Sequence, residues 1–262
     1  MTEPQISVRS LLRETFATTG SLYAPLLIIE SPSLIFAALK SFGILGSAGV
    51  AFNIIYSFVA IPFLSGARIF YTYRSLTRNQ VTVGQAFNQA NRRLLHLIWV
   101  PIMVLVRVVA GSSVLVLAVG IALLIIPRLS VAYYLVFSRY SLSRYSVLVW
   151  VGAAIIPALY LAGRLIFSLY ATVIDNSSAA DSFSSSWELT KGRWWLVSRA
   201  NFLIVLVVGV PIILISQLID PTGKSLASQL TSNLLGFLTG PLIDVYFVLL
   251  YLRLRESAAT IK

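Results

Sequence analysis

The chain has 262 residues, of which 58% are hydrophobic and only 11% are charged, and its formal net charge is +11. A soluble domain carries about 25% charged residues, so this composition excludes a water-soluble globule and predicts an all-α, polytopic membrane protein. The absence of cysteine excludes disulfide bonds, thiolate catalysis and metal sites with sulfur ligands.

Six apolar stretches are long enough to cross a bilayer, which takes about 20 residues. They comprise residues 21–40, 47–73, 95–126, 145–173, 194–218 and 229–252. The first begins near Leu22, after a polar segment, and contains Glu30 and Pro32, so we interpret it as a retained span and not a cleavable signal. The third is too long for one upright span. Either a tilted helix or a break near Gly111-Ser112-Ser113 would accommodate it, and Pro127 is expected to end it.

The lysines and arginines are distributed unevenly between alternate connections. When the neighbouring ends of the spans are counted with the connections, fourteen of the 20 belong to the N-terminal segment, to the connections after the second and fourth spans and to the C-terminal tail, whereas five belong to the other connections. The positive-inside rule therefore predicts that both termini are cytoplasmic. The tyrosine-rich segment 130–145 is then expected to form an extracytoplasmic cap. The positive cytoplasmic face also favours contact with anionic lipid head groups.

The two long cytoplasmic connections contain a similar pattern, 96 residues apart. Thr82-Val-Gly-Gln85 and Ser178-Ala-Ala-Asp181 both have the form of a capping box, which starts a helix. Apolar residues at helical spacing follow each box and predict short amphipathic helices at the membrane interface. Residues 8–16 form a third, weaker copy, in which Gly20 is expected to end the helix, as Gly192 is expected to do after the second box.

This pattern predicts three repeat units, each an interfacial helix followed by two spans. Their approximate bounds are 1–78, 79–174 and 175–262, within a single integral membrane domain. The second span of each unit contains a proline, Pro62, Pro157 or Pro241, which is expected to kink the helix.

The segment SSSWELTKGRWW, residues 184–195, leads into the fifth span. We interpret it as the end of an interfacial helix, a glycine turn and the start of the span, with its tryptophans in the aromatic belt. The residues expected to contact lipid head groups or a partner protein are Phe87, Arg92, Arg93, Phe183, Trp187, Lys191, Arg193 and Trp194.

Among the charged residues of the apolar stretches, the strongest candidates are Glu30, Arg107 and Asp244, because charge inside a membrane is costly and is usually functional. Arg107 either requires an anionic partner, such as Glu30 or Asp244, or extends to the interface. Glu30 is a candidate proton-coupled carboxylate, although a structural ion pair is the simpler interpretation. Asp244 is expected to pair with Arg164 or Arg68.

The sequence provides no signal for catalysis or for a cofactor. His96 is the only histidine, and one histidine without cysteines or clustered carboxylates does not make a metal site. Nucleophile-elbow, phosphate-loop, zinc-protease and dinucleotide motifs are absent. The basic residues are spread over the ends of the spans, which argues against nucleic-acid binding. We therefore expect a protein that is not an enzyme and has no cofactor.

Three segments of the chain resemble a bacterial family of membrane proteins. DSFSSSWELTKGRWWLV (181–197), VTVGQAFNQANRRLLHLI (81–98) and PLIDVYFVLLYLRLR (241–255) are similar to segments of proteins related to the membrane domain of glycerophosphoryl diester phosphodiesterases. The resemblance implies a six-span helical domain in a bacterial inner or internal membrane, joined in some relatives to a soluble phosphodiesterase. The catalytic carboxylates and histidines of that enzyme are absent from this chain, so the resemblance implies no activity here.

Two functions are consistent with these features. The first is a non-enzymatic scaffold, assembly or stabilising factor that holds a membrane protein partner or anionic lipids through its cytoplasmic interfacial helices. The alternative is a small transporter or exporter, in which Glu30, Arg107 and Asp244 line a path. The two differ in whether these charges meet at a continuous polar cavity or are each paired in a solid helical core.

Overall fold

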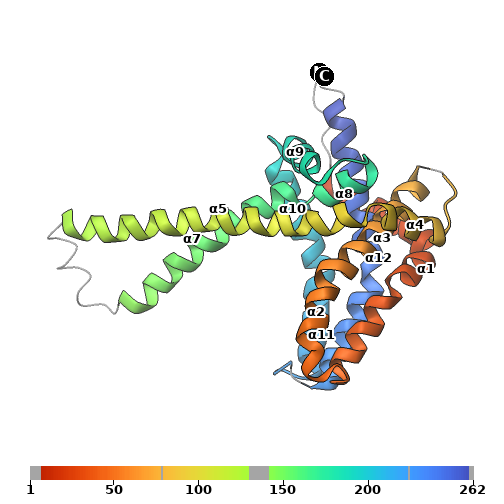
Figure 1. The fold of residues 1–262 in the computed structure, drawn as a ribbon, viewed down its shortest axis with the longest axis horizontal. Helices are drawn as coiled ribbons and strands as arrows, with labels where there is room; N and C mark the ends of the chain where they lie inside the picture. Colours follow the sequence, from red (N-terminus) through yellow and green to blue (C-terminus); the bar gives the residue numbers. More distant parts are fainter. Residues whose placement is uncertain (1–6, 78, 130–141, 224, 260–262) are drawn as a thin grey trace. The chain divides into compact units, whose positions relative to one another are not determined.

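A computed structural model describes residues 7–77, 79–129, 142–223 and 225–259 of the chain (Figure 1). Every regular element in these ranges is helical, which confirms the all-α fold. Six helical segments among the described residues are long and apolar enough to cross a membrane: Val8–Ser41, Gly49–Leu76, Leu94–Ala118, Ala154–Ile174, Trp194–Ile219 and Leu226–Ala259. The chain divides into two compact units, one of residues 1–101 and 167–262 and one of residues 102–166.

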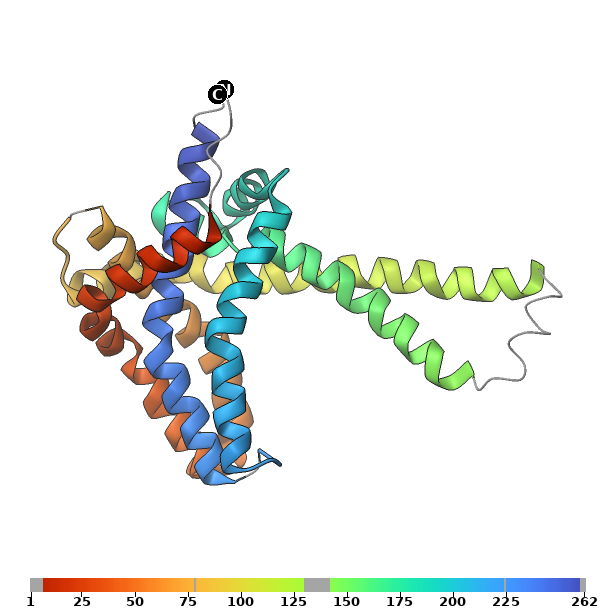
Figure 2. The same cartoon turned by 180° about the vertical axis from the view of Figure 1, so that it is seen from behind.

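In the first unit, helix α1 (Val8–Ser41) is continuous and changes direction along its length (Figure 2). The predicted end of a separate helix at Gly20 is wrong, because the helix passes through this residue without a left-handed backbone. Buried residues follow one side of the helix at spacings of three and four: Leu11, Thr15, Thr19, Leu22, Leu26 and Ile29. Since this stripe continues across Gly20, tertiary packing stabilises a helix that runs through it.

Two spans of the first unit each contain a short π-helical segment before a proline. One span comprises α2 (Gly49–Ile55), preceded by the short helix η1 (Gly46–Ala48), then η2 (Tyr56–Ala60) and α3 (Ile61–Leu76). The other comprises α10 (Trp194–Ile204), η3 (Val205–Gly209) and α11 (Val210–Ile219). The Ile61 amide donates to the Tyr56 carbonyl, and the Val210 amide donates to the Val205 carbonyl, in both cases five residues earlier. The next residue is a proline, which cannot donate to the carbonyl four residues before it, so the helix adopts a wider turn there.

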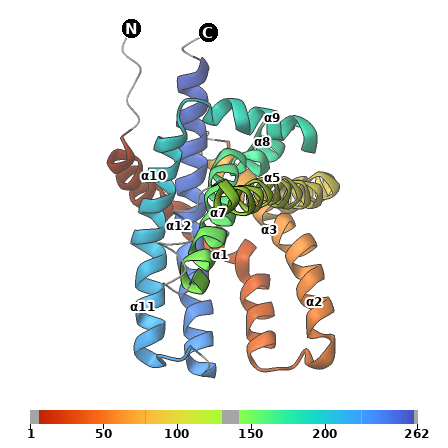
Figure 3. The ribbon, with the colours of Figure 1, turned by 90° about the vertical axis from the view of Figure 1, so that its left-hand side faces the viewer.

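Helix α12 (Leu226–Ala259) lies along α1 at the centre of the first unit. Tyr246 and Leu250 of α12 are fully buried, and the Tyr246 hydroxyl donates to the Ala200 carbonyl of α10 (2.9 Å). Figure 3 shows the α1–α2 and α11–α12 hairpins descending side by side, with their connecting turns at the same end. Each hairpin forms one wall of the site described below.

The capping boxes predict two short amphipathic helices, α4 (Val83–Arg92) and α9 (Ala179–Thr190), and both are present. The first box is complete: the Gln85 amide donates to Thr82 Oγ1 (3.3 Å), and the Thr82 amide donates to Gln85 Oε1 (2.9 Å). In the second, the Asp181 amide donates to Ser178 Oγ (3.2 Å), but the Asp181 carboxylate accepts from the Ser178 hydroxyl (2.6 Å) and not from its amide. Gly192, at φ +72°, turns the chain from α9 into α10, as predicted.

Helix α5 (Leu94–Leu129) begins in the first unit and forms the second unit together with α7 (Leu142–Leu165). It runs unbroken through Gly111-Ser112-Ser113, which decides between the two alternatives for the third span, and it continues past Pro127, contrary to our prediction. Gly111 instead makes room for Leu161 of α7, which a Cβ atom at this position would meet. Of the predicted cap at 130–145, residues 130–141 lie outside the described residues and the rest belong to α7.

Candidate functional site

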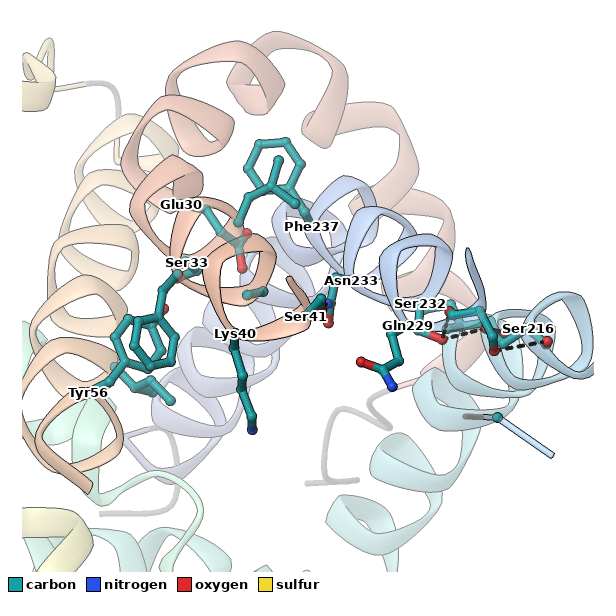
Figure 4. A pocket seen from close by; sticks show the side chains of 18 of the residues that line it. Glu30, Ser33, Lys40, Ser41, Tyr56, Ser216, Gln229, Ser232, Asn233 and Phe237 are labelled. Atoms are coloured by element: carbon teal, nitrogen blue, oxygen red, sulfur yellow. Dashed lines mark hydrogen bonds between the residues drawn. The ribbon is translucent and has the colours of Figure 1, made fainter. Parts of the chain in front are cut away.

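A polar cleft of about 830 Å³ lies within the first unit, between α1, the η2–α3 span, α11 and α12. In Figure 4, Glu30, Ser33 and Lys40 project from α1, and Asn233 and Gln229 project from α12. Its other polar lining residues include Ser41, Asn53, Tyr56, Ser57, Ser216, Gln217, Ser228 and Ser232. Such a concentration of hydroxyl and amide groups is unusual among membrane-spanning helices, where polar groups are costly unless they face water or one another.

Three largely buried charges, each from a different helix, form a cluster, and two of them, Glu30 and Arg68, line the cleft. Arg68 Nη1 of α3 lies 2.7 Å from Glu30 Oε1 of α1, and Arg68 Nε lies 3.4 Å from Asp244 Oδ2 of α12. None of the three side chains is more than 15% exposed. Because one guanidinium faces two carboxylates, this charge cluster carries one excess negative charge when all three groups are ionised.

The hydrogen-bonding capacity of the charge cluster is only partly used by the described residues. Three of its atoms are buried and have no hydrogen-bond partner among the described residues: Glu30 Oε2, Arg68 Nε and Asp244 Oδ2. Taking charged groups out of water costs several kcal/mol per ion, and close pairing recovers this only when the remaining polar atoms are satisfied. The cluster is therefore better explained as a feature retained for function than as a source of stability.

The Glu30 carboxylate lies directly against the backbone of α12 at Gly240. A Cβ atom at this position would overlap Glu30 Oε2, so a side chain here would displace the carboxylate. Pro241 follows immediately and cannot donate to the Phe237 carbonyl one turn earlier. Gly240 thus permits the close approach of α1 and α12 on which the charge cluster depends.

Aromatic and hydroxyl contacts shape the two walls of the cleft. Tyr56, from the π-helical segment η2, stacks on Phe36 of α1 with ring centroids 3.8 Å apart and planes 8° apart. On the opposite wall, the Ser216 and Ser232 hydroxyl oxygens are 2.6 Å apart and join α11 to α12. Each hairpin is therefore held together internally.

Asp220 and Lys40 bring charge to the end of the cleft where the hairpins turn. Asp220 accepts hydrogen bonds from the Thr222 amide (2.9 Å), the Thr222 hydroxyl (2.7 Å) and the Ser225 amide (2.6 Å). These bonds, led by the Ser225 amide, hold the pKa of the Asp220 carboxyl well below its usual range. The α11–α12 turn therefore keeps a fixed negative charge through mildly acidic conditions.

Of the three intramembrane charges that the sequence singled out, Glu30 and Asp244 belong to the first compact unit and Arg107 belongs to the second. Glu30 and Asp244 share Arg68, so of the two partners predicted for Asp244, Arg164 and Arg68, the second is confirmed. Arg107 is exposed on α5 in the second unit. Arg68 was not among the predicted site residues. The signal in the sequence that could have identified Arg68 is a basic residue inside an apolar stretch, six residues after Pro62.

The predicted lipid- and partner-contact residues divide into packed and exposed groups. Phe183 is 1% exposed and lies in the core, so its predicted contact with lipid or a partner is wrong. Phe87 stacks on Phe63 of α3, with ring centroids 5.7 Å apart. Arg93 Nη1 donates to the Asn176 carbonyl (3.1 Å).

The predicted contact residues in the segment that leads into α10 are also partly packed and partly exposed. Arg193 Nη1 donates to the Leu254 carbonyl of α12 (3.2 Å), and the Trp194 ring contacts that of Trp195. Trp194 is only partly exposed, whereas Trp195, which was not predicted as a contact residue, is 69% exposed. Among the predicted contact residues, Arg92, Trp187 and Lys191 present the exposed surface.

Comparison with protein-family models, curated proteins and solved structures finds no match to this chain. The family suggested by the three short segments therefore stays a prediction. In the described ranges, no group of three or more histidine, aspartate or glutamate side chains is arranged to hold a metal ion.

Proposed function

We propose that this multi-pass membrane protein binds a small polar solute in the polar cleft and moves it across the bilayer. The observation that carries the proposal is a polar cavity bordered by three buried charges inside an otherwise apolar helical bundle. A volume of about 830 Å³ suits a small molecule, since ligand sites typically occupy roughly 300–1,000 Å³. The lining hydroxyls, amides and charges match a solute that both donates and accepts hydrogen bonds.

The helix irregularities in the cleft walls support movement of the two hairpins. η2 contributes Tyr56 and Ser57 to the cleft, and η3 leads directly into Ile212 and Ile213 of the opposite wall. π-Helical segments are frequent at functional sites, and interrupted helices surround the binding sites of many transporters. Bending at these two positions would widen or narrow the cleft while the contacts within each hairpin persist.

The charge bias of the sequence provides the orientation in this proposal. With both termini cytoplasmic, in a bacterial inner or internal membrane, the hairpin turns and the mouth of the cleft face the extracytoplasmic side. The charge cluster then lies deeper, between the cleft and the cytoplasmic end of α3. No catalytic step is part of the proposed function.

Cysteine labelling tests whether the cleft contains water and closes around a solute. The chain has no native cysteine, so single cysteines provide clean reporters. Ser232→Cys and Asn233→Cys are expected to react with a membrane-impermeant thiol reagent roughly tenfold faster than Phe202→Cys, because thiolate formation requires water. Phe202 is the control because its side chain is 68% exposed on an apolar span surface that would face lipid.

The same variants identify the solute and test its transport. A solute that slows labelling of Ser232→Cys in intact vesicles, and accumulates in liposomes containing the protein, would support the proposed role. Equal, slow labelling at all three positions would mean that the cleft is closed to water and would count against transport.

A scaffold role on the cytoplasmic side is the second candidate. The exposed side chains of Arg92, Trp187 and Lys191 on the short amphipathic helices favour it, since aromatic and basic residues are common in interface anchors. Trp187→Ala with Lys191→Gln is expected to reduce co-purification of a specific membrane protein by more than roughly tenfold, as loss of a central anchor does. Phe16→Ala, at a residue 55% exposed on α1, provides the control. An unchanged set of co-purifying proteins would contradict this role.

A further inference from the structure

A second hollow, separate from the polar cleft, lies where α3 ends and α4 begins. Its volume is about 420 Å³, and its lining includes Phe70 and Arg74 of α3, Asn79 and Gln80 of the connection, and Asn88 and Arg92 of α4. α3 extends from the charge cluster at Arg68 to this hollow at Arg74, about 9 Å along the helix axis at 1.5 Å per residue. The same helix therefore contributes to two distinct sites.

The chemistry of the hollow is that of an anion site. Its lining contains two guanidinium groups and several side-chain amides but no carboxylate. Neither Arg74 nor Arg92 is in an ion pair with a carboxylate of the described residues. Two positive charges on one small surface repel each other unless an anion lies between them, and guanidinium groups match the geometry of phosphate oxygens.

Local contacts orient the Arg74 side chain and hold the helix that carries Arg92. The Arg74 guanidinium lies over the Phe70 ring, 5.4 Å from its centroid, which orients the side chain. Arg92 is in the last turn of α4, whose first turn is held by the complete capping box and whose Phe87 ring stacks on Phe63 of α3. The two arginines are thus presented by helices that are packed on each other.

We propose that this hollow binds the phosphate of an anionic phospholipid head group, with Arg74 and Arg92 as its ligands. The position favours a lipid over a soluble anion, because Arg74 lies in the last turn of α3, at the end of the candidate membrane span Gly49–Leu76. A basic residue at that depth lies among head groups, where each well-placed charge favours anionic lipid. The site is independent of the polar cleft and of any solute that the cleft binds.

Lipid retention by the purified full-length protein tests this site. The protein in mild detergent is titrated with phosphatidylglycerol or with phosphatidylcholine, and bound lipid is counted by native mass spectrometry. Arg74→Gln with Arg92→Gln is expected to weaken phosphatidylglycerol binding by roughly 30-fold, at about 1 kcal/mol for each charge. Binding of zwitterionic phosphatidylcholine should be unaffected.

Arg9→Gln with Arg13→Gln is the matched control, because it removes the same charge from two exposed positions on α1. It should leave phosphatidylglycerol binding within about twofold, since these residues do not line the hollow. Equal loss in both double variants would overturn the proposal in favour of a diffuse charge effect.

A competition experiment uses inorganic phosphate and glycerol 3-phosphate to displace the bound lipid. If either competitor displaces phosphatidylglycerol at a concentration no higher than that at which the lipid itself binds, the lipid assignment is overturned and a soluble phosphate is identified as the ligand.

Discussion

Replacement of Arg68 by methionine is expected to lower the free energy of unfolding by about 3–5 kcal/mol. The variant keeps an unbranched apolar stem but leaves Glu30 and Asp244 without the cation that lies 2.7 Å and 3.4 Å from them. Unfolding by heat or by sodium dodecyl sulfate in mixed micelles, followed by circular dichroism, measures the change. Arg74→Met, at an exposed position on the same helix, is expected to change stability by about 1 kcal/mol or less.

A neutral replacement of the whole charge cluster separates its structural role from its functional one. Glu30→Gln, Arg68→Met and Asp244→Asn together are expected to regain most of the stability lost in Arg68→Met, since a buried ion cluster is often no more stable than neutral residues of similar size. If the cluster serves the polar cleft, this triple variant should fold but lose solute protection of Ser232→Cys. A triple variant as unstable as Arg68→Met would show that the ion pairs themselves hold the helices together. Full solute protection in a stable triple variant would remove the cluster from the proposed mechanism.

The sequence predicted the features of the fold that depend on neighbouring residues. The six spans follow from hydropathy, and the starts of α4 and α9 follow from Thr82 and Ser178 with the residue three positions later. Gly192 was recognisable because it stands between a helical pattern and an aromatic span start. In each case, the residues that determine the helix start, turn or span lie within or next to it in the sequence.

The wrong predictions concern features that tertiary packing decides. Gly20 has the local signature of a helix end, but the buried stripe from Leu11 to Ile29 continues through it. Pro127 lies near the end of α5 without ending it. A local rule states what a residue permits, whereas the contacts on both sides of it determine which permitted conformation is stable.

The polar cleft was not predictable from the sequence, because its lining comes from four separate segments. Serine, asparagine and glutamine residues on α1, η2, α11 and α12 are unremarkable in each span and become a site only when the two hairpins face each other. The charge cluster has the same origin, since Glu30, Arg68 and Asp244 are far apart in the chain. Reasoning from the sequence could name two of these charges as costly, but it could not choose their shared partner.

Gly240→Ala is expected to destabilise the protein by about 1–3 kcal/mol, because the added methyl group occupies the position of Glu30 Oε2. The carboxylate can move only by leaving Arg68, so a small steric change becomes the loss of a buried ion pair. Gly236→Ala, one turn earlier on the same helix, is the control. Apart from its two chain neighbours and the adjacent backbone of α12, no atom of the described residues lies within 4 Å of the added methyl group, and the alanine should stabilise the helix by up to about 1 kcal/mol.

A double-mutant cycle between Glu30 and Gly240 determines whether this steric contact is the cause. Glu30→Ala removes the side chain that the new methyl group would meet, so Gly240→Ala should cost little in that background. The two changes are expected to deviate from additivity by about 0.5–3 kcal/mol, as contacting residues do, whereas Glu30→Ala and Gly236→Ala should be nearly additive. Additive behaviour at Gly240 would mean that α1 and α12 do not approach each other as closely as the charge cluster requires. In that case Arg68 would have to be shared between the two carboxylates in a different arrangement, and the link between the charge cluster and the polar cleft would be lost.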